Sequence, residues 1–279
     1  MEQPLLGLSC YKSLKSPIKL QGGGTIQMPA IQPESIFHRV FDQMSVRILQ
    51  MTAFLSADEF TVLRWKEEID KLSITQPGMA ALCAAYLDHM MGDIEAVESH
   101  LSYAVAKGIP RQPIVNATLT SCCNLLFATK ALKVFRAGID IKYQNIGSHI
   151  QLALSCGGFQ HSLYLLKQAE MAKLDLLKEG MSTILPEAAS VLGMQGISDD
   201  DCAKVLDAAG EVMRSRRVFW QGSEPRYVVN RKEQTVAVRL WVDVSAAEAA
   251  DMTMETADKL IERHLDGLPY FVSFVGTRR

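Results

Sequence analysis

The stretch Thr75–Pro110, TQPGMAALCAAYLDHMMGDIEAVESHLSYAVAKGIP, predicts two helices folded back on each other. Thr75 is in position to cap the first helix, and Pro77 falls in its first turn, where a missing N–H costs nothing. Gly92 breaks the pattern, and Gly108 supplies the left-handed residue that ends the second helix. Between the two glycines, apolar residues recur at three- and four-residue steps on one helix face: Ile94, Val97, Leu101, Ala104 and Val105. The stretch therefore predicts an antiparallel helical hairpin with one apolar seam.

Similar hairpins are predicted on both sides of this stretch. Upstream, a 3.6-residue apolar stripe from Ile36 to Leu55 indicates a helix, and Ser56 is expected to cap a second one. Downstream, another helix is expected from about Pro113. Glycines mark the ends of the later predicted helices: Gly138, Gly157-Gly158 and Gly180. Three or four consecutive hairpins predict a helical stack over residues 34–215.

The segment Ala85–Pro110 resembles a tetratricopeptide repeat, and the segment Ile150–Ala169 is similar to it. The resemblance is carried by a short set of positions: Gly92-Asp93-Ile94, Val97, Leu101, Ala104 and Pro110. The family's bulky aromatic in the first helix is replaced by Ala81 or Leu82, so the chain looks like a degenerate, tetratricopeptide-like solenoid over residues 34–180. The resemblance implies a concave surface, lined by the first helix of each pair, that binds a peptide or a partner protein. The groove candidates are Tyr86, His89, Gln144 and Gln151.

The composition is that of a globular protein without a strong charge preference. The chain has 279 residues, of which 48% are hydrophobic and 22% charged, and its formal net charge is −2. This balance gives no global attraction to nucleic acid, and no apolar run approaches the ~20 residues that a membrane-spanning helix needs. The six cysteines are scattered without a C-x-x-C pair, which indicates reduced thiols and a cytoplasmic protein.

Residues 1–33 are expected to form a flexible tail. Between Gln3 and Pro33 there is no acidic residue, and three lysines are interleaved with Ser, Gln, Pro and Gly. An alternative interpretation is that this tail is an export or targeting address, which would make the protein a secreted effector or a secretion chaperone. The tail lacks the apolar core of a signal peptide.

The period changes from 3.6 to 2 after Val218, which predicts a small ββαβ module over residues 216–279. Apolar and other residues alternate strictly from Thr235 to Val244, as in a half-buried strand, and Tyr227 to Val229 can pair with it as a hairpin. Ser245 and Glu248 have capping-box spacing. The helix that follows is expected to bury four residues: Ala257, Leu260, Ile261 and Leu265. A last strand is predicted over Tyr270 to Val275, and the sheet could pair with a second copy of the chain.

A basic patch is predicted around the start of this module. It comprises Arg214, Arg216, Arg217, Arg226, Arg231 and Lys232, with aromatic residues between them. Basic and aromatic side chains on a small sheet are typical of proteins that hold single-stranded nucleic acid. The alternative is that these arginines stabilise a helix end and protect a sheet edge. Residues 214–239 are therefore a candidate nucleic-acid surface.

No catalytic or metal-binding pattern is present in the sequence. The six histidines lack the spacing of a zinc site, no G-x-S-x-G occurs, and Cys122-Cys123 is expected to pack between helices. We therefore expect no metal and no cofactor. The favoured function is a non-catalytic protein–protein interaction scaffold that uses its helical groove or its C-terminal sheet. An enzyme with catalytic residues dispersed along the chain stays open.

Overall fold

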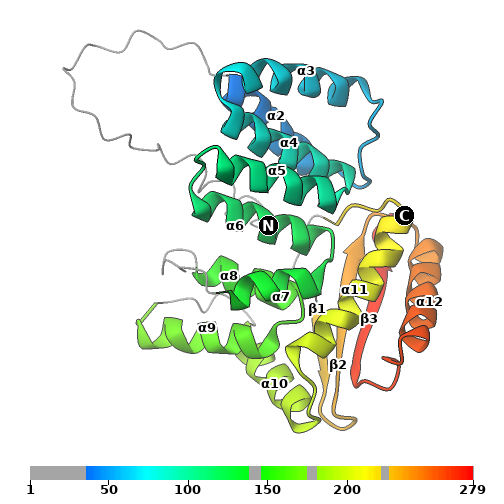
Figure 1. Cartoon of the computed structure of the whole chain (residues 1–279). Helices are drawn as coiled ribbons and strands as arrows, with labels where there is room; N and C mark the ends of the chain where they lie inside the picture. The colour runs from blue at the N-terminus through cyan, green and yellow to red at the C-terminus, as the bar shows by residue number, and fades with distance from the viewer. Residues whose placement is uncertain (1–35, 138–145, 175–180, 221–225, 279) are drawn as a thin grey trace.

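The computed structural model describes residues 36–137, 146–174, 181–220 and 226–278. Helices follow one another from the N-terminal side to a three-stranded sheet at the C-terminal end (Figure 1). The fold is mainly α with a small C-terminal α+β module, as the sequence predicts. The packing of neighbouring helices is that of stacked helical hairpins.

The first half of the stack contains the hairpin on which the sequence prediction rests. Its elements are α2 (Ile36–Ile48), α3 (Phe60–Thr75), α4 (Pro77–Met91) and α5 (Ile94–Ala106). Gly92 ends α4 with a φ of 85°, a left-handed conformation that suits a residue without Cβ. The Asp93 side chain then accepts a hydrogen bond from the N–H of Ala96 at 3.0 Å and begins α5. The predicted hairpin and its turn are confirmed.

Two predicted helix starts are wrong. Thr75 is the last residue of α3, and its hydroxyl donates to the carbonyl of Leu72 in that helix, so it does not cap α4. Only Gln76 separates the two helices. Ser56 begins a turn before α3, where its backbone N–H donates to the Glu59 carboxylate at 2.8 Å. The Thr75 hydroxyl therefore satisfies a carbonyl at the end of α3, and the Ser56 hydroxyl donates to the Asp58 carboxylate, so neither side chain caps the start of a helix.

The second half of the stack leads toward the sheet. Its elements are α6 (Arg111–Asn124), α7 (Ala128–Arg136), α8 (Ile146–Ser155), α9 (Phe159–Met171), α10 (Met181–Met194) and α11 (Asp199–Ser215). A Cβ on Gly157 would lie 2.8 Å from Cys202 Cβ, so the turn between α8 and α9 approaches α11 more closely than other residues allow. Ser198 and Asp201 form the capping box that begins α11. The predicted ends at Gly138 and Gly180 lie outside the described residues.

The C-terminal module has the predicted ββαβ order. Its elements are β1 (Arg226–Asn230), β2 (Thr235–Val242), α12 (Ala246–Glu262) and β3 (Tyr270–Gly276), and the spatial order of the strands is β1-β2-β3. Strands β1 and β2 are antiparallel, with Tyr227 opposite Val238. Strands β2 and β3 are parallel, with Val238 opposite Val272, and α12 makes the crossover that a parallel pair requires.

Helix α12 buries only part of the face that the sequence predicts: Leu260 is buried and Leu265, just after the helix, is half-buried, whereas Ala257 and Ile261 are exposed. The capping box of Ser245 and Glu248 is confirmed, but the buried residues are Ala249, Met252, Thr256 and Leu260, and Ile261 is 57% exposed. The reason is that α12 packs on both α11 and β3. Its Thr253 hydroxyl accepts the N–H of Phe274 at 3.0 Å, which fixes the helix against β3 and satisfies an N–H of that edge strand.

The module is joined to the stack through one continuous hydrophobic core. The Tyr227 hydroxyl donates to the carbonyl of Leu154 at 2.6 Å, and the ring of Phe159 contacts the rings of Tyr227 and Tyr270. After α11 the chain runs back along the loop that follows α2, where the N–H of Phe219 donates to the carbonyl of Thr52. The sheet is therefore packed directly against the helices.

Candidate functional site

Tyr86 and His89, two of the predicted groove residues, lie in the core. Their exposed fractions are 3% and 1%. The Tyr86 ring lies 4.8 Å from that of Phe41, and the His89 ring lies 5.7 Å from that of Phe219. Burial lowers the pKa of His89 to about 3, so its imidazole is neutral. Because neither side chain reaches solvent, we correct the expectation that these two residues line a groove.

The other two groove candidates, Gln151 and Gln144, give no evidence for a groove. Gln151 is half-buried on α8, and its carbonyl accepts a hydrogen bond from the Ser155 hydroxyl. Gln144 lies outside the described residues. The helical groove that the resemblance implies therefore stays a prediction.

Two arginines of the predicted basic patch, Arg214 and Arg217, bind main-chain carbonyls of the helical stack. The Arg214 guanidinium lies 3.8 Å from the centre of the Phe127 ring and donates to the carbonyls of Leu125 and Leu126. Burial lowers its pKa. Arg217 donates to the carbonyls of Phe54 and Leu55 at 3.1 and 3.0 Å. These two side chains tie the end of α11 to two loops of the helical stack.

Two further arginines are held by carboxylates. Arg216 forms an ion pair with Glu255 on α12, and Arg231 forms one with Glu187 on α10. The hydrogen bonds of these pairs raise the pKa of each arginine and lower that of each glutamate. Lys232 is exposed in the turn between β1 and β2. The predicted patch is thus dispersed over several elements, and only Arg226 lies on a sheet face.

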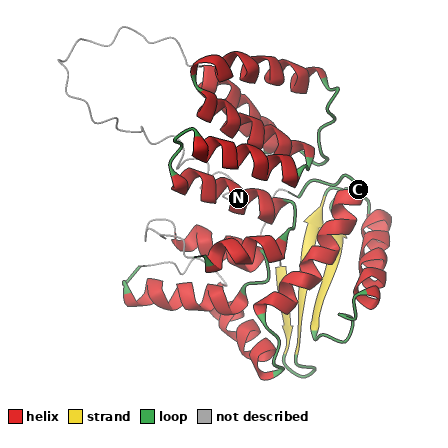
Figure 2. Ribbon diagram, viewed as in Figure 1, coloured by secondary structure: helices red, strands yellow, loops and turns green. Residues whose placement is uncertain are grey.

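The side of the sheet turned away from the core carries a different cluster, which we call the open face. Its residues are Arg226, Val228, Arg239, Trp241 and Phe271. Alternation along the strands sends their side chains away from buried neighbours such as Val238 and Val272. The opposite side of the sheet faces the core, and α11 crosses in front of the strands in Figure 2.

The open face brings two positive charges together. Arg226 and Arg239 are directly opposite each other in the β1–β2 register, and neither has a carboxylate partner among the described residues. Like charges at directly opposite positions repel, so an anion that binds both guanidinium groups removes an unfavourable interaction. The Arg226 guanidinium lies 4.9 Å from the centre of the Trp241 ring, as in a cation–π contact.

Apolar side chains flank this charged row. Val228 and Phe271 are 43% and 48% exposed, and both are aligned with Ala237 in the register of the three strands. The indole nitrogen of Trp241 is buried and has no hydrogen-bond partner within the described residues. The open face can therefore contact a ligand that combines negative charge with apolar or aromatic groups.

Part of the open face could be predicted from the sequence. The strict alternation of β2 already placed Arg239 and Trp241 on one side. The contribution of Phe271 depends on the parallel pairing of β3 with β2, and no local pattern reveals that pairing.

No group of three or more histidine, cysteine, aspartate or glutamate residues within the described parts of the chain is arranged to hold a metal ion. None of the helices that the structure describes is long and apolar enough to cross a membrane. In comparisons with known proteins, no family model, no curated protein and no solved structure gives a significant match to the chain.

Proposed function

We propose that this protein is a non-catalytic interaction protein that binds an acidic segment of a partner protein on the open face of its C-terminal sheet. The observation that carries the proposal is the pair Arg226 and Arg239, which stand opposite each other without a carboxylate partner among the described residues. A guanidinium group binds a carboxylate through two parallel hydrogen bonds, and this geometry suits arginine better than lysine.

The neighbouring apolar side chains support a protein ligand. Val228 and Phe271 are large enough to bury an apolar residue of a partner beside the carboxylates that Arg226 and Arg239 bind. Such burial contributes ~25 cal/mol per Å² of apolar surface. The helical stack acts as the scaffold, because the buried side of the sheet is fixed to it through Tyr227.

The test compares two double charge reversals in the full-length chain. Arg226→Glu with Arg239→Glu changes the open face, and Lys133→Glu with Lys167→Glu makes the same change in net charge elsewhere on the surface, on the exposed sides of α7 and α9. Each protein is cross-linked in native extract, and the captured partners are quantified by mass spectrometry. We expect a partner that the wild type and the control capture equally and that the open-face variant captures at least tenfold less.

The captured partner is then purified, and binding of its acidic segment is measured at several salt concentrations. Affinity should fall with salt, because charged side chains carry the contact. Equal capture by all three proteins, or a partner whose binding does not depend on its acidic residues, contradicts the proposal.

The same face supports a second candidate, a nucleic-acid-associated factor. Trp241 and Phe271 lie on either side of the row that contains Arg226 and Arg239, so bases could stack while the arginines bind phosphates. Stacking of a base on an aromatic side chain contributes about 1–3 kcal/mol. Titration of a labelled single-stranded oligonucleotide tests this candidate. Salt-dependent binding that Phe271→Ala weakens would favour it, and the absence of binding at low salt would exclude it.

A further inference from the structure

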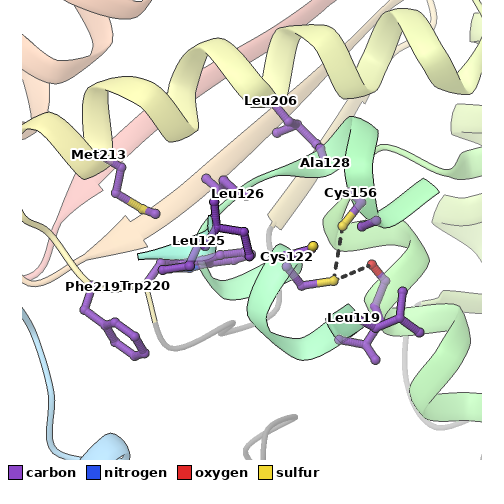
Figure 3. Close-up of a cluster of buried hydrophobic side chains, with 14 of the residues drawn as sticks. Leu119, Cys122, Leu125, Leu126, Ala128, Cys156, Leu206, Met213, Phe219 and Trp220 are labelled. Carbon is purple, nitrogen blue, oxygen red and sulfur yellow. Dashed lines mark hydrogen bonds between the residues drawn. The ribbon is translucent and has the colours of Figure 1, made fainter. Parts of the chain in front are cut away.

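Two cysteine sulfurs meet inside the helical stack. The Sγ atoms of Cys123, at the end of α6, and Cys156, just after α8, are 3.2 Å apart. Cys123 Sγ also lies 3.6 Å from the carbonyl oxygen of Leu152, one turn before Cys156. Figure 3 shows the buried cluster around this contact, which includes Leu119 and Cys122. Within the described residues, no other two cysteines make such a contact.

The geometry suits a covalent bond between these two sulfurs. A disulfide has an S–S length of about 2.05 Å, so the two sulfurs need to approach by only about 1.2 Å from their 3.2 Å separation. The two cysteines are 33 positions apart in the sequence, and the helices beside them, α6 and α8, pack against each other. A bond here therefore joins distant parts of the chain without moving a helix past its neighbour.

We propose that Cys123 and Cys156 form an intramolecular disulfide when the protein meets a peroxide. In the first step one thiolate attacks hydrogen peroxide, which breaks the O–O bond and gives a sulfenic acid and water after protonation. In the second step the other thiol attacks the sulfenic sulfur, forms the S–S bond and releases a second water. The two thiols lose two electrons in total, and the peroxide is reduced to two water molecules.

Burial makes this reaction slow in the folded protein. The hydrogen bond with Cys156 and desolvation raise the pKa of Cys123 well above its usual range. Because the thiolate is the reacting form, the rate should increase between pH 7 and pH 9. The same burial protects the finished bond from bulky reductants. The crosslink therefore forms and breaks on the timescale on which the core opens to small molecules.

The bond should stabilise the protein, and it should form only in an oxidising environment. It encloses α7 and α8 in a covalent loop and restricts the unfolded chain, which is the main way a disulfide stabilises a protein. The scattered cysteines of the sequence indicate reduced thiols, and this pair shows how the same chain would respond to an oxidising environment. The inference rests on the sulfur geometry and does not depend on the function proposed above.

The experiment treats the full-length protein with hydrogen peroxide, blocks the remaining thiols in denaturant and maps tryptic peptides without reduction. The expected product links peptide Gln112–Lys130 to peptide Tyr143–Lys167, with loss of two hydrogen atoms. The melting temperature should rise by several degrees and return to its original value after reduction. Because the first peptide contains two cysteines, Cys122→Ser is the matched control and should still form the link.

The variants Cys123→Ser and Cys156→Ser should lose both the linked peptide and the shift in melting temperature. The proposal is overturned if the folded wild type gives no linked peptide under conditions that oxidise the same chain in denaturant. It is also overturned if Cys122→Ser abolishes the link, since that result assigns the bond to Cys122. The wild-type peptide map decides the question even where a serine variant does not fold.

Discussion

The end of α11 and the open face of the sheet both carry arginines, and the two regions use them in opposite ways. At the end of α11, the half-buried Arg214 and the exposed Arg217 bind four main-chain carbonyls. On the open face, Arg226 and Arg239 lie on neighbouring strands, and neither has a carboxylate partner among the described residues. An arginine in this protein is structural where main-chain carbonyls without another donor lie within its reach. A count of charges along the sequence does not show which arginines lie near such carbonyls.

The largest effect is expected from the removal of a structural arginine. Arg214→Ala leaves the carbonyls of Leu125 and Leu126 without their donor and uncovers the Phe127 ring. We expect a loss of about 3 kcal/mol in the free energy of unfolding, because buried acceptors lose charged hydrogen bonds. Urea denaturation measures it.

The matched control for this comparison is Arg239→Ala on the open face. Its side chain is exposed and makes no ion pair with a described residue, so its loss should change the unfolding free energy by less than about 0.5 kcal/mol. Equal losses for the two alanine variants would show that the division into structural and exposed arginines is wrong.

A second prediction concerns the histidine that packs beside the end of α11. His89 contacts Phe219, and its pKa is lowered to about 3 by burial. The unfolded chain binds a proton near pH 6.5 that the folded chain cannot bind, so stability is present above that pH and is lost as the pH falls. We expect His89 to account for a loss of about 2 kcal/mol between pH 7.5 and pH 5.

Urea denaturation across this pH range measures the loss, with His89→Phe as the control that cannot titrate. The variant should lack this part of the pH dependence while other groups continue to contribute theirs. Identical pH profiles for the two proteins would mean that the folded chain binds a proton at His89 as readily as the unfolded chain, so burial would not lower the pKa of His89.

A smaller effect is expected at Arg217, where the backbone also matters. The φ of Arg217 is 55°, a left-handed conformation that glycine adopts without strain. Arg217→Ala and Arg217→Gly both lose the hydrogen bonds to Phe54 and Leu55, but only glycine relieves the backbone. We therefore expect alanine to cost about 1.5 kcal/mol and glycine about 1 kcal/mol less than alanine. Thermal and urea denaturation of the pair separates the two contributions.

The parts of the fold that local patterns encode were predictable from the sequence. Gly92, the capping box at Ser245, and the alternation of β2 each depend on neighbours within a few positions. For this reason the hairpins and the ββαβ order agree with the structure. Local signals of this kind locate the elements but do not determine what covers them.

The candidate site was less predictable, because it depends on contacts between distant segments. Tyr86 and His89 are buried under Phe41 and Phe219, which come from two other parts of the chain. The predicted face of α12 is wrong in part for the same reason, since Leu260 is buried but Ile261 is exposed, with β3 and α11 packed on the other side. The spacing of apolar residues defines a helix face but does not identify its neighbours.

The smallest effect on stability is expected where the largest effect on binding is proposed. In the double variant Arg226→Glu/Arg239→Glu, two like charges are replaced by two like charges of the opposite sign, so the repulsion across the strands is kept. The unfolding free energy should therefore change by less than about 0.5 kcal/mol, even though the contact of Arg226 with Trp241 is lost. A single reversal, Arg239→Glu, creates an ion pair with Arg226 and should stabilise the protein by a few tenths of a kcal/mol. If the single reversal is stabilising while the double one is neutral, the two side chains interact directly across the strands, and any loss of partner binding in the double variant comes from charge and not from unfolding.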